Sequence, residues 1–248
     1  MGSFLEREKT RQAEFKRRSP YFSPAARAPG VYRKALRPFV LPRDLARENL
    51  FPGIREAAPR FFAQHKIKWH DGQAGNPSNH LCDSQVCCVN FLFPYAKEPN
   101  ALADLLDPVI PNLRKMLPVE DDQYVTFEWI GEKDYLGEKD AARNKRRSRG
   151  ANCTSADAAV LIELRGGGRQ MVLIEWKYTE SYGATPFHVG VSGERRLKTY
   201  LPWLAPDDTP LSGWRITACC STSPSTSSCG SSFWPRRWSV QASATHRQ

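Results

Sequence analysis

Long apolar segments are missing from this chain of 248 residues. No apolar run approaches the ~18 residues that a membrane-spanning helix needs, so we expect no membrane span. The N-terminal stretch MGSFLEREKTRQAEFKRR is charged from its sixth residue and has no apolar centre, which argues against a secretory signal. These absences favour a cytoplasmic protein that does not contact a membrane.

Paired metal-binding cysteine motifs are also missing. Seven cysteines are present, but no two CxxC motifs occur, which argues against a structural zinc site. Cys82, Cys87 and Cys88 lie together in one apolar segment rather than in a disulfide-like spacing. This distribution favours reduced thiols and again a cytoplasmic location.

Acidic residues are in the minority. The chain has 36 Lys and Arg against 26 Asp and Glu, a net charge of +10 and a pI near 9.4. Such a surplus favours polyanionic partners, above all nucleic acid, through phosphate contacts and counterion release. A basic but merely solvated surface would give the same totals.

The basic surplus is concentrated at the N-terminus. Residues 1–60 hold 14 Lys and Arg against six Asp and Glu, and prolines at 20, 24, 29, 38, 42 and 52 interrupt them. We interpret this segment as an extended basic arm with short helical pieces. It either lies along nucleic acid or is a loosely attached extension. The remainder divides into a domain at 61–215 and a tail at 216–248.

Helix and strand patterns alternate after residue 80. An apolar helix is expected between His80 and Tyr95, capped by Asp83 or Ser84 and closed by Pro94. Further elements follow: a short helix at Ala101–Leu106, strands at Tyr124–Ile130, Thr154–Leu164 and Gln170–Glu180, and a helix starting at Gly193–Tyr200. Three glycines at 166–168 join the last two strands as a hairpin. The order predicts an α/β fold with a mixed sheet.

Charged residues interrupt the last apolar strand. Glu175 and Lys177 are two residues apart and therefore share one face of it. The hairpin can bring Asp157 beside Glu175. Two strand carboxylates suit a hard cation such as Mg²⁺ or Mn²⁺, which would polarise a phosphodiester and activate water. A salt bridge at the strand end is the simpler explanation of the Glu175 and Lys177 pair.

The segments SAD and VLIEWKYTE resemble the second and third motifs of the PD-(D/E)XK, or restriction-endonuclease-like, nuclease superfamily. With their flanks TSADAAV and EWKYTESYG, they are similar to a bacterial group of restriction-endonuclease-like proteins, over roughly residues 80–200. The resemblance implies an α-β-β-β-α-β core. It also implies metal binding by Asp157 and Glu175, with Lys177 as the catalytic lysine.

The first motif of that superfamily, often a glutamate on the opening helix, departs from the pattern. Gln85 occupies the matching helix, and a neutral amide would weaken metal binding. Glu128 in the first strand is an equal candidate for the missing catalytic acid, and Glu138 is a further rival. The choice between Gln85 and Glu128 stays open.

A basic loop separates the first two of the three predicted strands. Residues 139–150 read KDAARNKRRSRG, and Lys145, Arg146, Arg147 and Arg149 are the candidates for nucleic-acid backbone contacts. A solvated charged loop would have the same composition.

The tail after Arg215 is rich in serine and cysteine and has no usable periodicity. Joining the last base of each codon to the first two of the next allows Ala218–Ser239 to read LLLYEPFDQLMRQQLLAQEME, an apolar strand followed by an amphipathic helix. We interpret residues 216–248 as a frameshifted tail that is irregular and exposed. A chain without its final strand and helix is expected to be unstable or inactive.

Together these observations predict a metal-dependent nuclease whose expected substrate is DNA, with RNA less favoured. Two alternatives remain: a degenerate relative that binds nucleic acid without cleaving it, and a basic protein-interaction module. Sequence preference and oligomeric state are not predicted by any of these patterns.

Overall fold

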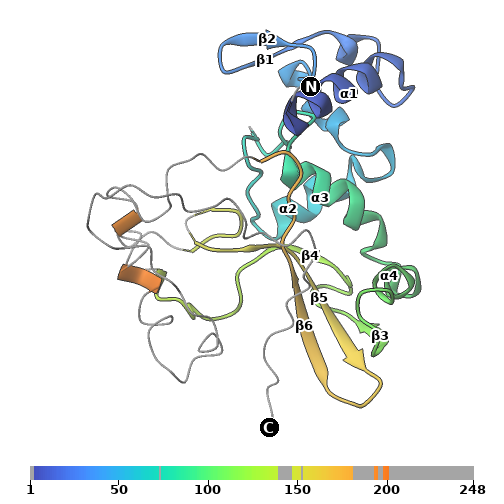
Figure 1. Ribbon diagram of the computed structural model, residues 1–248, viewed down its shortest axis with the longest axis vertical. Coiled ribbons are helices and arrows are strands. Elements are labelled where there is room, and N and C mark those ends of the chain that lie inside the picture. The colour runs from blue at the N-terminus through green and yellow to red at the C-terminus, as the bar shows by residue number, and fades with distance from the viewer. Residues whose placement is uncertain are drawn as a thin grey trace, which may run out of the picture.

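A computed structural model describes residues 3–72, 74–138, 147–151, 153–180, 193–194 and 198–200 of the chain. Helices lie beside a small sheet, and the N-terminal elements pack at the end of these helices that is away from the sheet (Figure 1). This arrangement confirms the α/β class predicted from the sequence. Within the described residues, no helix has the length and apolar character required to cross a membrane.

The N-terminal region opens with a long helix. Helix α1 (Phe4–Arg18) is 15 residues long, and the Ser3 side chain caps it by accepting a hydrogen bond from the amide of Glu6. A two-stranded antiparallel hairpin follows, β1 (Gly30–Tyr32) and β2 (Ala35–Arg37). Short 3-10 helices complete the region: η1 (Ala25–Arg27), η2 (Arg43–Asn49) and η3 (Pro52–Ile54).

This region is folded, which differs from the extended arm expected from its prolines. The ammonium group of Lys16 is buried and donates hydrogen bonds to the carbonyls of Ala28 (2.9 Å) and Val40 (2.8 Å). The prolines leave α1 intact because the first of them, Pro20, lies beyond its end. The expected extended arm is instead a folded region, because helix α1 occupies the stretch that precedes the prolines.

The N-terminal region and the following residues share one core. Leu50 and Ile54 are buried in the same cluster as Phe61 and Phe62 of helix α2 (Ala57–Gln64). Helix α2 also runs across residue 60, where the sequence suggested a boundary. The division into domains remains a prediction, but the chain on either side of this boundary packs together.

Strand β5 is the centre of the main sheet. It spans Ala156–Leu164 and pairs antiparallel with β3 (Leu113–Leu117), β4 (Thr126–Trp129) and β6 (Arg169–Ile174). The tight β5–β6 turn uses the positive φ of Gly167 and Gly168. Every pairing among the described strands is antiparallel, which differs from the mixed sheet expected from the sequence. The final strand of the expected core was assigned to the tail, which lies outside the described residues.

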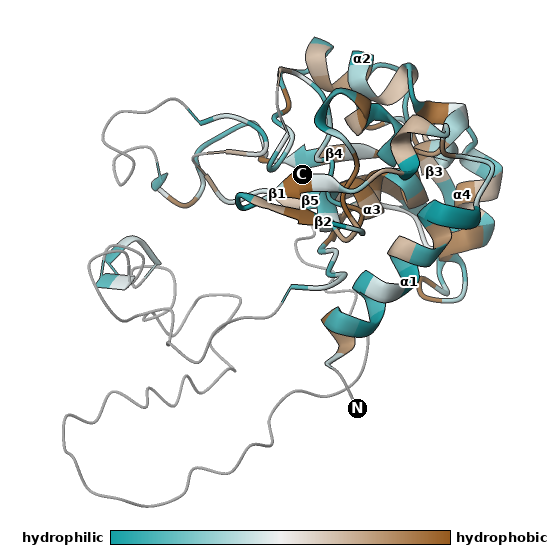
Figure 2. Ribbon diagram, turned by 90° about the horizontal axis from the view of Figure 1, so that it is seen from above, coloured by the Kyte–Doolittle hydropathy of each residue, from teal (hydrophilic) through white to brown (hydrophobic). Residues whose placement is uncertain are grey.

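Helices α3 (Ser84–Leu92) and α4 (Pro99–Leu106) lie against this sheet, and η4 (Phe93–Tyr95) connects them. Asp83 caps α3 by accepting a 2.8 Å hydrogen bond from the amide of Val86, which confirms one of the two predicted caps. Apolar residues gather around α3 and β5 (Figure 2). This core fixes the start of α3 relative to the start of β5.

Several predicted elements agree with the structure and others do not. Helix α3, helix α4 and strands β4 to β6 occur where expected, although β6 ends at Ile174 rather than at residue 180. Strand β3 was not predicted. Of the helix expected to start at Gly193–Tyr200, residues 193–194 and 198–200 are described and are helical, whereas the whole tail from 216 lies outside the described residues. The described cysteines, Cys82, Cys87, Cys88 and Cys153, are free thiols.

Candidate active site

Three carboxylates lie side by side near the start of β5. We call Glu128, Asp157 and Glu175 the acidic row. The β4–β5 register pairs Phe127 with Ala158 and Trp129 with Ala156, so Glu128 falls opposite Asp157. The β5–β6 register pairs Ala158 with Ile174, and one step further Glu175 falls opposite Asp157. Cross-strand neighbours lie about 5 Å apart at Cβ. Asp157 therefore stands between two other acidic residues.

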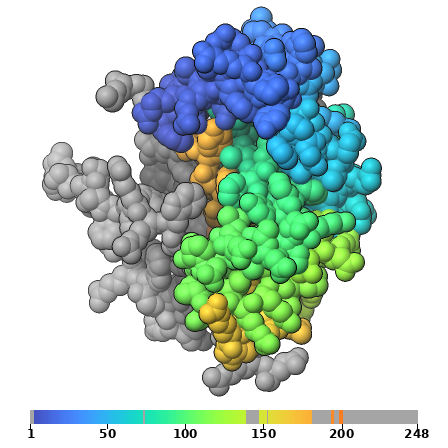
Figure 3. Space-filling view, turned by 90° about the vertical axis from the view of Figure 1, so that its right-hand side faces the viewer, coloured from blue at the N-terminus to red at the C-terminus, as the bar shows by residue number. Residues whose placement is uncertain are grey.

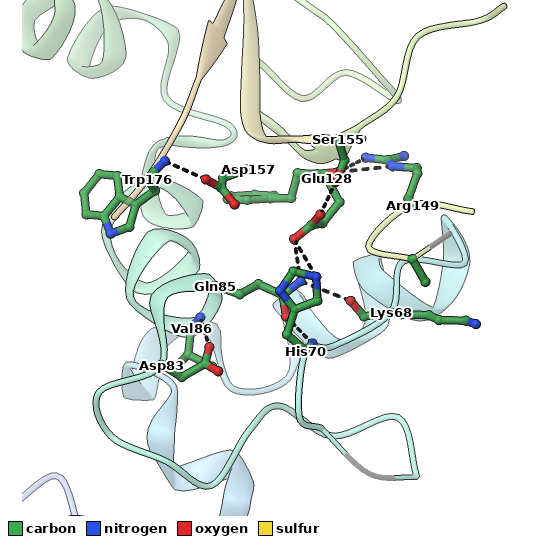
Figure 4. A network of polar contacts seen from close by, with 12 residues as sticks. Lys68, His70, Asp83, Gln85, Val86, Glu128, Arg149, Ser155, Asp157 and Trp176 are labelled. Carbon is green, nitrogen blue, oxygen red and sulfur yellow. Dashed lines mark hydrogen bonds and ion pairs between the residues drawn. The ribbon is translucent and has the colours of Figure 1, made fainter. Parts of the chain in front are cut away.

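The Asp157 side chain turns toward the segment that follows β6. One of its carboxylate oxygens accepts a 2.6 Å hydrogen bond from the backbone amide of Trp176, the residue between Glu175 and Lys177 (Figure 4). The sequence-predicted trio is thus brought together by its own backbone. Asp157 does not point away from the acid and lysine pair.

Burial is the main influence on the ionisation of Asp157. It raises the pKa of this carboxyl to about 6. The Trp176 amide and the Lys177 charge lower the pKa, whereas the charges of Glu175 and Glu128 raise it. The raised pKa reflects the cost of placing a negative charge here beside two other acids. A bound cation would offset that cost and so would be stabilised at this site.

Lys177 and Glu175 form a direct ion pair. The Lys177 ammonium lies 2.5 Å from a carboxylate oxygen of Glu175. Their side chains are 44% and 63% exposed. An ion pair this exposed contributes little stability, so both groups stay accessible to a solvent-borne ligand.

Gln85 and Glu128, the two rivals for the first motif, contact each other. The Gln85 amide nitrogen donates a 2.6 Å hydrogen bond to Glu128 Oε1, and both side chains are buried (Figure 4). Gln85 also donates to the carbonyl of Lys68 (3.0 Å) and accepts from the amide of His70 (2.7 Å). The structure therefore joins both candidates in one buried network rather than favouring either.

The Glu128 carboxylate has further partners that the sequence did not reveal. Ser155 donates a 2.6 Å hydrogen bond to its second oxygen, and His70 Nε2 lies 3.7 Å from the first. Glu128 also has a φ of 49°, a left-handed conformation that costs a non-glycine residue about 1–3 kcal/mol. Only the position of Ser155 beside Asp157 in SAD was a signal for its role.

The metal-binding potential of the row follows from its donor atoms. No group of three His, Cys, Asp or Glu residues within the described ranges forms a ready ligand cage. Asp157 on β5 and Glu175 directly after β6 nevertheless offer only oxygen donors, which is the chemistry that Mg²⁺ accepts with water in its remaining positions. Two protein carboxylates fit that ion, whereas a zinc site would need more nitrogen or sulfur ligands.

The predicted nucleic-acid contacts are only partly described. Lys145 and Arg146 lie outside the described residues. The Arg149 guanidinium binds both carboxylate oxygens of Glu120 at 2.9 Å, and Arg147 donates to the carbonyl of Ile130. Both arginine side chains are at least 85% buried. Their charges are used to hold the protein together, so the free phosphate contacts expected of them do not match this geometry.

An apolar cavity of about 810 Å³ adjoins the row. Its lining includes Trp129, Leu106 and Leu173, and it reaches Glu175 and Trp176 at the end of β6. The exposed side chain of Leu173 contributes to it. The cavity therefore opens beside the acidic row without enclosing it.

Comparison with known proteins gives one family. A family model described as "Restriction Endonuclease associating with ARP" (REase-ARP) matches residues 9–208, which include every described residue of the acidic row. No curated protein gives a significant match, and neither does a solved structure. The predicted frameshifted tail lies beyond the matched residues. The chain belongs to the REase-ARP family.

Proposed function

We propose that this chain is a metal-dependent nuclease of the PD-(D/E)XK class that hydrolyses phosphodiester bonds in DNA. Membership of a family named for restriction endonucleases supports a nuclease-like function with a nucleic-acid partner. The observation that carries the finer proposal is the hydrogen bond from the Trp176 amide to Asp157. It ties an aspartate on one strand to the E-W-K segment on the next.

Each residue of the row has a role in this proposal. Asp157 and Glu175 would hold Mg²⁺ or Mn²⁺, since both offer carboxylate oxygens, one from β5 and one from the residue after β6. When bound, such an ion lowers the pKa of water and polarises a phosphoryl oxygen. The Lys177 ammonium, now paired with Glu175, would orient the attacking water or stabilise the charge that develops on phosphorus.

Gln85 and Glu128 would position the row rather than touch the substrate. Both are buried, and Glu128 is held by Gln85 and Ser155. Burial is the main cause of the raised pKa of Asp157, and the charge of Glu128 adds to it. The pair would therefore tune how readily Asp157 accepts a cation in place of a proton.

A second candidate function is a degenerate relative that binds DNA without cleaving it. The neutral Gln85 favours it, because an amide committed to Glu128 and to two backbone groups supplies no charge to a metal. The two functions share the nucleic-acid partner and differ in chemistry.

A cleavage assay on supercoiled plasmid separates the two functions. The purified chain is titrated with MgCl₂ and MnCl₂, and nicked or linear products are quantified. We expect Asp157→Ala and Lys177→Ala each to lower the rate at least about 100-fold. Glu163→Ala is the matched control, because this acid lies on the same strand but binds Arg114 and Lys115 at the other end.

The outcomes distinguish three cases. Activity that both Asp157→Ala and Lys177→Ala retain would reject the assignment of these residues. DNA binding without cleavage at any metal concentration would favour the degenerate relative. A chain translated in the restored reading frame tests whether the altered tail is the cause of missing activity.

A further inference from the structure

The β1–β2 hairpin projects from the N-terminal region, away from the main sheet (Figure 1). Its two strands are three residues each and are joined by only Arg33 and Lys34. It is therefore a narrow two-stranded arm with a basic tip.

The tip is held in an unfavourable backbone conformation. Arg33 has a φ of 49° and Lys34 a φ of 64°. A two-residue turn with both φ values positive strongly prefers Asn-Gly, and long side chains are rare in it. Strain of this kind is retained where the side chains have a use, so the choice of Arg and Lys here needs a reason beyond folding.

The hairpin surface is both basic and apolar. Arg33, Lys34 and Arg37 are exposed, and none of them forms an ion pair with a carboxylate of the described residues. Val31 and Leu36, which face each other across the two strands, are 60% and 68% exposed. The Arg33 guanidinium lies over the Tyr32 ring (5.3 Å), but no carboxylate of the described chain neutralises these three charges, and most of the apolar pair faces solvent.

The base of the hairpin packs against His80, shortly before helix α3, and Gln85 on that helix contacts Glu128 of the acidic row. The His80 ring packs between those of Tyr32 (4.8 Å) and Phe39 (5.1 Å), and Val40 forms a β-bridge with His80. Helix α3, which carries Gln85, begins only four residues later. The arm therefore has a fixed direction relative to the row.

We propose that the β1–β2 hairpin is a DNA-binding arm that enters a groove of the duplex, with Arg33 and Lys34 on phosphates and the pair Val31 and Leu36 against sugars or bases. A major groove admits a two-stranded ribbon of this kind, and apolar side chains contact thymine methyl groups there. Positive charge at the tip and negative phosphates are complementary. The inference rests on the DNA partner of the proposed function but not on cleavage.

A double substitution separates binding from folding. Arg33→Asn combined with Lys34→Gly removes both charges and installs the dipeptide that the turn prefers. We expect the melting temperature to rise by about 2 °C while DNA affinity falls about 10-fold. A purely structural hairpin would not move these two quantities in opposite directions.

Affinity is measured for a short mixed-sequence DNA duplex in EDTA, so that no cleavage occurs. The slope of log affinity against log salt should become shallower by about 2, near one unit for each lost phosphate contact. Arg114→Ala combined with Lys115→Ala is the matched control, since this exposed Arg-Lys pair lies on β3. The control should leave the slope unchanged.

Two results would overturn the inference while leaving the DNA partner intact. One is equal affinity and equal salt slope for the hairpin variant and the wild type. The other is a loss seen equally with the Arg114 and Lys115 control, which would reduce the effect to total charge. A wild-type chain that fails to bind the duplex at low salt would instead reject the DNA partner of the proposed function.

Discussion

The side-chain amide of Gln85 donates a 2.6 Å hydrogen bond to the carboxylate of Glu128 and so joins the first turn of α3 to β4. The same side chain satisfies the carbonyl of Lys68 and the amide of His70. Replacing it by leucine leaves the buried Glu128 carboxylate and two partly buried backbone groups without this partner. We expect Gln85→Leu to lower the free energy of unfolding by about 3 kcal/mol, measured by urea denaturation.

Gln64→Leu is the control for that substitution. Gln64 is exposed, and its hydrogen bond to Asp121 lies at the surface. Its loss should change the free energy of unfolding by less than about 0.5 kcal/mol. Equal effects of the two substitutions would mean that the buried network contributes nothing specific.

Asp157 should make stability depend on pH. Its folded pKa of about 6 lies above the ordinary value near 4, so its contribution is fully present below about pH 4 and is lost as the pH rises through 6. Asparagine cannot ionise, so Asp157→Asn should be increasingly more stable than the wild type between pH 4 and pH 7. Thermal melts across this range measure the difference.

Asp83 gives an independent check of the same window. Burial also raises its pKa to about 6, and asparagine can replace it as a helix cap. Asp83→Asn should therefore show a similar trend without affecting cation binding.

If Mg²⁺ binds Asp157, added Mg²⁺ should raise the melting temperature of the wild type more at pH 7.5 than at pH 5, and this effect should be absent from Asp157→Asn.

Tyr178 connects α1 to the segment that carries Lys177. Its hydroxyl donates to Glu8 (3.0 Å) and accepts from Gln12 (2.8 Å), both on α1. Burial raises the pKa of Tyr178 to about 12, so the hydroxyl remains a donor at ordinary pH. In space-filling view the N-terminal residues sit directly against the segment that follows β6 (Figure 3).

Removing this hydroxyl should loosen the Lys177 segment locally. We expect Tyr178→Phe to speed hydrogen exchange of the amides at 175–180 about tenfold, while exchange in β5 stays unchanged. Tyr21→Phe is the control, because the Tyr21 side chain is exposed. Unchanged exchange at 175–180 would show that α1 does not hold this segment.

Gly30 should tolerate no side chain. A Cβ at this position would lie 1.9 Å from the carbonyl oxygen of Leu41, a backbone atom that cannot move aside cheaply. We expect Gly30→Ala to cost about 2–3 kcal/mol of unfolding free energy. Gly166→Ala, which meets nothing within 4 Å, should cost less than about 0.5 kcal/mol, and equal melting temperatures would contradict the close approach.

Local patterns explain which elements were predictable. The cap at Asp83 and the apolar run after it are contiguous, and so are the glycines between β5 and β6. The acidic and basic residues of α1 pair at helical spacing, for example Glu14 with Arg17 and Arg18, which was a signal for a helix that the prolines obscured. Strand β3 has charged residues on its exposed side and gave no clear period.

Contacts between distant residues explain what the sequence could not provide. Asp157 and the E-W-K segment were foreseen because one hairpin brings them together. The Gln85 and Glu128 pair, in contrast, joins a helix to a strand that a separate core positions. Arg149 pairs with Glu120, which lies 29 residues earlier, so the sequence around either residue does not reveal the contact. The roles of these residues remain proposals.

The contact between α1 and Tyr178 has a consequence for synthesis of the chain. Tyr178 lies 166 residues after Gln12 and 170 residues after Glu8, so it leaves the ribosome long after both of its partners. Helix α1 must wait through the translation of nearly all of the described chain before its partner emerges. The contact that holds the Lys177 segment against α1 can therefore form only after Tyr178 has been translated. If the chain is a nuclease, its active site would become ordered only after that point.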